Sequence, residues 1–138
     1  MDNPTTIIFA EDNPQDVRLF KYALSQLDTP IQLLHFENGR NLLEAIPDIY
    51  PATIACALVD LNMPFVNGFE VISALRTNSD FKHTPIVVFT NTNSNEERSR
   101  CYELGANAYV PKPLEIDDLV KVVNSIFDFW VKTNVRVM

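Results

Sequence analysis

Side chains that can hold a metal ion or a phosphate follow four short apolar runs of the chain. Taken singly, each has an ordinary interpretation: Asp12 suits a turn, Thr90 can close a strand, and Lys112 can be a solvated loop lysine. Complementary groups after every one of the four runs are harder to explain by chance, so the pattern predicts one shared site. The candidate residues, in chain order, are Glu11, Asp12, Asp60, Asn62, Thr90, Asn91 and Lys112.

The three carboxylates of this set predict a divalent cation site. Carboxylates held within a few ångströms repel, and one takes up a proton unless a cation is present. Mg2+ binds one or two carboxylates and keeps several waters. We expect Asp12 and Asp60 as direct ligands of Mg2+ or Mn2+, Glu11 as a ligand through water, and the Asn62 backbone carbonyl as a further oxygen.

A carboxylate in such a site can also act as a nucleophile toward phosphorus and form an aspartyl phosphate. Asp60 is the candidate, because it closes the apolar run "ATIACALVD" where that run leaves the core. The added phosphoryl oxygens need donors and positive charge. The Lys112 ammonium and the Thr90 hydroxyl can supply them.

The elements that must position these residues alternate along the chain. Apolar runs predict five strands, and apolar residues at helical spacing predict five helices between and after them. Such alternation predicts a parallel sheet covered by helices on both faces, with ligands outside the carboxyl ends of its strands. The expected strands are 5–10, 31–37, 52–60, 84–91 and 108–111, and the expected helices are 12–27, 40–46, 68–78, 95–104 and 115–132.

Length and composition limit the class of protein. A chain of 138 residues fits one domain, with a core over about 5–130 and a short tail over 131–138. The net charge of −7 argues against a general nucleic-acid binder. No apolar run reaches the length of a membrane span, and the start of the chain does not resemble a signal peptide. Two cysteines, Cys56 and Cys101, fit free thiols in a reducing compartment, so we expect a cytoplasmic protein.

The sequence lacks the motifs of several classes of enzyme. The chain has only three glycines and no glycine-rich phosphate loop, which argues against dinucleotide binding and ATP hydrolysis. No Ser-His or Cys-His pair stands out for acyl transfer.

The whole set resembles the receiver domain of bacterial two-component response regulators over about residues 5–130. The resemblance implies a flavodoxin-like, doubly wound α/β fold with strand order 2-1-3-4-5. It is carried by the following residues: Glu11 and Asp12, Asp60 in "LVDLNMP", Gly68, Thr90 in "FTN", Tyr109, and Lys112 with Pro113.

This resemblance implies that Asp60 accepts a phosphoryl group from a sensor histidine kinase or a phosphotransfer protein. Glu11 and Asp12 would hold Mg2+, and Lys112 would bridge to the phosphate. Such a protein is not an enzyme toward outside substrates, since it catalyses only its own phosphotransfer and dephosphorylation.

The resemblance also implies a switch, in which Thr90 moves toward the phosphoryl group and Tyr109 turns inward. Met63 and Asn91 would lie beside the phosphate, and the bond before Pro113 would be cis. Asn91 stands where a small residue is frequent, so we expect it to alter dephosphorylation.

The output is expected to be a protein contact on the face formed by helix 95–104, strand 108–111 and helix 115–132. The last helix has a wide apolar stripe, to which Val122, Phe129 and Val131 add. The stripe predicts contact with a partner protein, a homodimer through this helix, or local packing against the tail. Its "FW" ending resembles stand-alone receivers that work with bacterial phytochromes.

Three other interpretations are weighed against this one. A flavodoxin-like cofactor binder needs a phosphate-binding loop where this chain has the acidic "EDNPQD". A Mg2+-dependent phosphatase needs a substrate cap that the chain lacks. A receiver-fold scaffold that is never phosphorylated stays as the main alternative.

Overall fold

Five parallel strands form one sheet in the computed structural model, which describes residues 5–137. The spatial order is β2-β1-β3-β4-β5, as the resemblance predicted. Residues within β1, β3 and β4 are buried throughout, which explains their continuous apolar sequences. The strands are β1 Thr6–Ala10, β2 Gln32–Phe36, β3 Ile54–Val59, β4 Ile86–Thr90 and β5 Ala108–Pro111.

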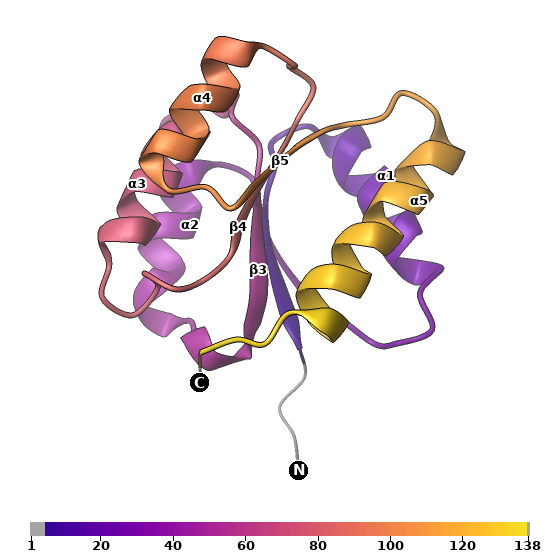
Figure 1. Ribbon diagram of the computed structural model, residues 1–138, viewed down its shortest axis with the longest axis horizontal. Coiled ribbons are helices and arrows are strands. Elements are labelled where there is room, and N and C mark those ends of the chain that lie inside the picture. Colours follow the sequence, from indigo (N-terminus) through magenta and orange to yellow (C-terminus); the bar gives the residue numbers. More distant parts are fainter. Residues whose placement is uncertain (1–4, 138) are drawn as a thin grey trace.

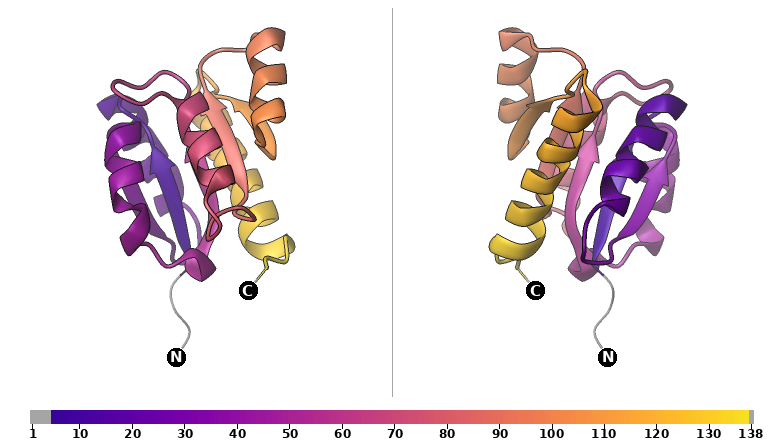
Figure 2. Two further views of the ribbon diagram at one scale, coloured as in Figure 1. Left: turned by 90° about the vertical axis from the view of Figure 1, so that its left-hand side faces the viewer. Right: turned by 90° about the vertical axis from the view of Figure 1, so that its right-hand side faces the viewer.

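Helices cover both faces of the sheet (Figure 1). Helices α2, α3 and α4 lie on one side, and α1 and α5 lie side by side on the other, as the two views of Figure 2 also show. Each side has its own cluster of buried apolar side chains. The helices are α1 Pro14–Ser25, α2 Gly39–Ala45, α3 Gly68–Thr77, α4 Asn95–Leu104 and α5 Ile116–Phe127, with 3-10 turns at Ile46–Asp48 and Pro51–Thr53.

Side-chain caps fix where the helices begin beside the carboxyl edge of the sheet. Asn13 Oδ1 accepts hydrogen bonds from the backbone N–H groups of Gln15 (2.9 Å) and Asp16 (3.2 Å) and starts α1. The Ser94 hydroxyl accepts one from the Glu97 N–H (3.3 Å) and starts α4. Because these caps follow β1 and β4 closely, the loops that carry the candidate site are short.

The chain after α5 differs from the expectation of one helix to residue 132. The α-helix ends at Phe127, and π-helical turns follow over Asp128–Thr133. Val122 and Val131, expected as surplus apolar surface, are partly buried against the core cluster between α1, α5 and the sheet, whereas Phe129 is half exposed. Local packing therefore accounts for most of the wide stripe.

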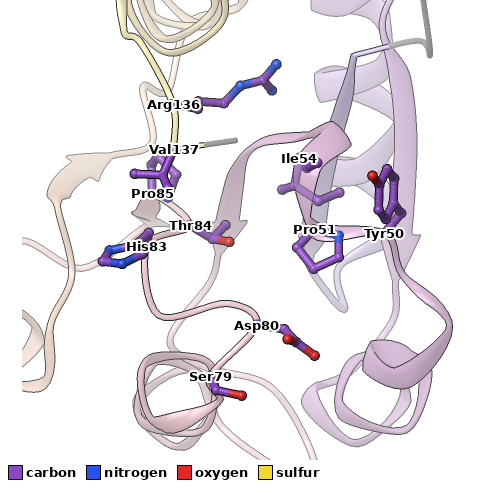
Figure 3. A pocket seen from close by; sticks show the side chains of 11 residues that line it. Tyr50, Pro51, Ile54, Ser79, Asp80, His83, Thr84, Pro85, Arg136 and Val137 are labelled. Carbon is purple, nitrogen blue, oxygen red and sulfur yellow. The ribbon is translucent and has the colours of Figure 1, made fainter.

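The end of the described chain borders a cavity of about 360 Å3 at the amino edge of β3 and β4. Figure 3 shows Arg136 and Val137 on one side of this cavity, with Ser79 and Asp80 on the other. Arg136 Nη1 is buried and has no hydrogen-bond partner among residues 5–137. The cavity lies at the opposite end of the strands from the predicted site, so it is separate from it.

The two cysteines are buried and unpaired. Burial raises the pKa of Cys56 to about 12 and that of Cys101 to about 11, so both are expected to be unreactive thiols. None of the helices described over residues 5–137 has both the length and the apolar composition that a membrane span requires.

Candidate phosphoacceptor and metal site

Two neighbouring strands bring three carboxylates together. Ala10 of β1 pairs with Val59 of β3, so the residues that follow, Glu11 and Asp60, emerge side by side. The Asp60 N–H donates to the Ala10 carbonyl oxygen (3.1 Å) and holds the two chains together at this point. One carboxylate oxygen each from Glu11, Asp12 and Asp60 lies within 4.8 Å of the others. Glu11 and Asp60 are buried, and Asp12 is exposed.

Lys112 reaches this acidic cluster from the carboxyl end of β5, a strand at the edge of the sheet. Its backbone N–H donates to the Thr90 carbonyl oxygen (2.7 Å), which aligns the end of β5 with the end of β4. Its ammonium donates to Glu11 Oε1, to Asp16 Oδ2 at 2.9 Å and to Asp60 Oδ2 at 3.4 Å. The Lys112 side chain is only 6% exposed, so these carboxylates take the place of water around the charge.

The charges at the site alter the acidity of two groups. Burial raises the pKa of Glu11 to about 7, and the charge of Asp60 adds to this, although the hydrogen bond from Lys112 opposes it. Burial alone lowers the pKa of Lys112, but the hydrogen bond to Glu11 and the charges of Asp60 and Glu11 outweigh burial and raise it. Lys112 is therefore an ammonium surrounded by more negative than positive charge.

A cavity of about 370 Å3 opens beside the carboxylates. Asn62 and Asn91, both predicted site residues, are exposed and line it with the acids. Thr90, which precedes Asn91, and Met63, which follows Asn62, are buried and do not line the cavity. The full lining is Glu11, Asp12, Asn13, Pro14, Asp16, Asp60, Asn62 and Asn91.

The two predicted switch residues are linked through a third. The Tyr109 hydroxyl donates to the Thr92 carbonyl oxygen (2.9 Å) and lies 3.2 Å from Thr92 Oγ1. Thr92 Oγ1 lies 3.5 Å from Thr90 Oγ1, so hydroxyl groups connect the end of β4 with β5. The Arg98 guanidinium of α4 lies 5.7 Å from the centre of the Tyr109 ring, which adds α4 to this group.

One expectation about the site is wrong. No cis peptide bond occurs in residues 5–137, so the Lys112–Pro113 bond is trans. The trans form is the favoured isomer of an X-Pro bond, by about 0.5–1 kcal/mol. Lys112 reaches the carboxylates in this arrangement as well.

The apolar pair Phe65-Val66 divides between surface and core. Val66 is partly buried against the core cluster under α2 and α3. Phe65 is 68% exposed, and it has a φ of 68°, a region that a phenylalanine rarely adopts. The Arg40 guanidinium stacks 4.2 Å from the centre of its ring.

Sequence reasoning missed several residues that hold the site. Asp16 contacts Lys112, and its position in the first turn of the helix after Asp12 could have indicated this. His35 Nε2–H donates to the Glu11 carbonyl oxygen (2.8 Å), and the Asn13 N–H donates to Glu11 Oε2 (3.2 Å). Thr92 had no signal beyond its closeness to Thr90.

The donor set fits a hard divalent cation. Three carboxylates converge on an open cavity, and oxygen ligands with room for water are what Mg2+ and Mn2+ require. Glu11, Asp12 and Asp60 are the residues that would hold the ion.

The receiver class of signalling domains is defined by this strand order together with the cluster of three acids and Lys112. The chain belongs to the response regulator receiver domain family, which matches residues 7–124. It is therefore a receiver domain of two-component signalling, a class whose members interact with histidine kinases and downstream targets.

The chain is similar to curated and structurally solved response regulators, one of them a phytochrome response regulator. The chain is 30% identical to response regulator Rcp1 of Synechocystis over 137 residues, which cover 94% of this chain and 91% of Rcp1. The phosphorylated cyanobacterial phytochrome response regulator RcpA superposes with a TM-score of 0.90 at 25% identity, covering 99% of this chain and all of that one. The Mn2+-bound form of Rcp1 superposes with a TM-score of 0.86 at 29% identity, covering 98% of this chain and all of that one.

Proposed function

We propose that Asp60 accepts a phosphoryl group from a sensor histidine kinase or a phosphotransfer protein, and that the modified chain then regulates a partner protein. The observation that carries the proposal is the position of the Asp60 carboxylate. It borders an open cavity, belongs to a group of three acids, and lies 3.4 Å from the Lys112 ammonium.

The transfer is a displacement at phosphorus. A carboxylate oxygen of Asp60 attacks the phosphorus atom of a phosphohistidine, a P–O bond forms, the P–N bond breaks, and the imidazole leaves. The Lys112 ammonium offsets charge on the phosphoryl oxygens, and the Thr90 hydroxyl can donate to one of them. A Mg2+ or Mn2+ ion held by Glu11, Asp12 and Asp60 would supply further positive charge at the phosphate.

Phosphorylation replaces the single negative charge of the Asp60 carboxylate by a phosphoryl group that carries about 1.5 to 2 negative charges and three strong acceptor oxygens at the carboxyl edge of the sheet. A move of Thr90 toward these charges lengthens its contact with Thr92 and so disturbs the hydroxyl group of Tyr109. Because Arg98 of α4 lies against the same ring, the change extends to the surface of α4, β5 and α5. We assign the output to this surface.

The partners follow from the same proposal. We propose no activity on an outside substrate: water attacks the aspartyl phosphate and returns Asp60 to its resting form. For the downstream partner we favour a different protein over a second copy, since Val122 and Val131 of the predicted dimer surface pack inward.

The test is incubation with acetyl phosphate and Mg2+ followed by intact-mass measurement. We expect the wild type to gain one phosphoryl group, Asp60→Asn to gain none, and the distant surface variant Asp28→Asn to behave as wild type. Absence of an adduct on the wild type would instead favour an unphosphorylated receiver-fold scaffold. An undiminished adduct on Asp60→Asn would place the modification elsewhere.

A further inference from the structure

Lys112 is shared with a carboxylate outside the metal cluster. Asp16, in the first turn of α1, accepts a hydrogen bond from the ammonium at 2.9 Å, whereas Asp60 accepts one at 3.4 Å. Asp16 is not among the three acids whose oxygens converge within 4.8 Å. Its contact at the site is therefore with the lysine rather than with the predicted ion.

The position of Asp16 is fixed by the start of the helix. Its backbone N–H donates to Asn13 Oδ1 (3.2 Å), so the first turn of α1 determines where the carboxylate points. The Asp16 side chain is 25% exposed, and the Lys112 side chain is 6% exposed. A partly solvated acid thus keeps the buried ammonium on the α1 side of the site.

The contact between Asp16 and Lys112 occupies one of a limited number of N–H donors. A lysine ammonium has three N–H donors, and Glu11, Asp16 and Asp60 each receive one. A phosphoryl group on Asp60 would add strong acceptors beside the longest of these contacts. The Lys112 ammonium can donate fully to these acceptors only if its hydrogen bond to Asp16 weakens.

We propose that Asp16 is a positioning residue that competes with Asp60 for Lys112. It holds the ammonium against α1 in the resting protein and thereby lowers the affinity of the site for a phosphoryl group. The lowered affinity for a phosphoryl group rests on the proposed phosphorylation of Asp60, whereas the resting contact between Asp16 and Lys112 does not.

The proposal predicts opposite effects on an anion and a cation when Asp16 is replaced by Asn. Asp16→Asn leaves Lys112 free to face Asp60 and removes a like charge, so beryllium fluoride, a phosphoryl mimic, should bind about tenfold tighter, the factor of one charge-assisted hydrogen bond. Mg2+ alone should bind more weakly, because the site loses negative charge and the ammonium moves toward the ligands. A site that was merely damaged would lose affinity for both.

The first experiment measures both affinities by titration calorimetry, with beryllium fluoride added at saturating Mg2+ and Mg2+ added alone. The proteins are the wild type, Asp16→Asn, Asp16→Glu, which keeps the charge, and Asp28→Asn, which makes the same charge change on a distant exposed loop. We expect the opposite shifts in Asp16→Asn only, with Asp16→Glu close to the wild type. Equal affinities in Asp16→Asn and the wild type, or weaker binding of both probes, would overturn the proposal.

The second experiment needs neither metal nor phosphate. Lys112 is acetylated with an active ester in the metal-free protein, and the rate is followed by peptide mass spectrometry. We expect faster acetylation of Lys112 in Asp16→Asn than in Asp28→Asn, and the wild-type rate in Asp16→Glu. The same rate in Asp16→Asn and Asp28→Asn would overturn the resting contact. If the rate rises but the wild type binds no beryllium fluoride, the contact stands and the proposed function of Asp60 fails.

Discussion

Gly68, at the start of α3, lies against the backbone of the candidate nucleophile. A Cβ atom at this position would lie 2.4 Å from the Asp60 carbonyl oxygen and 2.7 Å from the Leu61 Cα. The Gly68 N–H also donates to the Leu61 carbonyl oxygen (3.0 Å), so the loop is closed tightly by its own backbone. Glycine is required here by close approach, since its φ is not positive.

Gly68→Ala should therefore destabilise the protein by about 1–3 kcal/mol, because backbone atoms must move to admit the methyl group. Urea denaturation followed by circular dichroism measures the free energy of unfolding. Ser99→Ala, on the exposed side of α4, should change it by less than about 0.5 kcal/mol. Equal stability of the two variants would contradict the close approach.

Asn91 is exposed in the wall of the cavity beside Asp60. We expect this side chain to obstruct water that attacks an aspartyl phosphate at Asp60, so Asn91→Ala should shorten the lifetime of the phosphorylated protein several-fold. Decay is followed by intact mass after removal of acetyl phosphate, with Asn95→Ala, outside the cavity lining, as the control. An unchanged lifetime in Asn91→Ala would show that this side chain does not limit access of water.

Single residues were predictable from sequence where the backbone decides their position. Asp60 and Glu11 could be placed because they follow paired ends of parallel strands. The contact between Lys112 and Asp16 could not be predicted, because the end of a long flexible side chain can reach several nearby acids. Which of Phe65 and Val66 faces the core cannot be predicted from the sequence, since only the turn geometry determines it for two adjacent apolar side chains.

At the scale of elements, one side chain at the end of α3 is hydrogen-bonded to the segment before β4 and to the turn between α4 and β5. Arg76 Nε and Nη2 donate to the Gly105 carbonyl oxygen (3.0 and 2.7 Å), and Nη2 also donates to Asn107 Oδ1 (2.8 Å). Nη1 donates to the carbonyl oxygens of Lys82 (2.8 Å) and Thr84 (3.0 Å). The guanidinium therefore connects the end of α3, the segment before β4 and the turn before β5.

Arg76→Met should lower the free energy of unfolding by on the order of 2–3 kcal/mol, because it leaves several acceptors without their charged donor. Amide hydrogen exchange should accelerate most in the turn around Gly105. Arg100→Met is the matched control, since Arg100 is exposed and stacks on Phe69 at 4.0 Å; it should cost less than about 1 kcal/mol. If Arg100→Met cost as much as Arg76→Met, the five hydrogen bonds would not explain the effect.

The strands and the first four helices were placed from sequence to within about two residues at each end, whereas the end of the last helix was placed too late. The strand expected over 52–60 begins at Ile54, because Pro51 starts a 3-10 turn instead. The helix expected to reach 132 keeps its α-helical bonds only to Phe127. Apolar periodicity persists through Trp130 and Val131, which pack on the core, so the pattern marks burial correctly but does not distinguish α-helical from π-helical turns.

At the scale of the whole molecule, the net charge of −7 and the apolar surface of α5 together determine self-association. Exposed apolar side chains at this helix include Leu114 (98% exposed) and Ile116 (39%) at its start and Phe129 (49%) just after its end, so they lie at opposite ends of the helix. Stable interfaces bury about 1,200–2,000 Å2. A few scattered side chains on an acidic molecule fall short of that, so we expect a monomer before phosphorylation.

Sedimentation velocity of the metal-free, unphosphorylated protein at micromolar concentration should give a single monomeric species. Phe129→Asp should leave that species unchanged and should barely alter stability, because half of the Phe129 side chain is already in solvent. Trp130→Ala is the contrasting variant: its side chain is partly buried on the core cluster beside α5, so it should lower stability by about 2 kcal/mol without changing the oligomeric state. A wild-type dimer that Phe129→Asp dissociates would contradict this prediction and restore the homodimer through α5. It would mean that the half-exposed ring is an interface anchor rather than the edge of a locally packed helix.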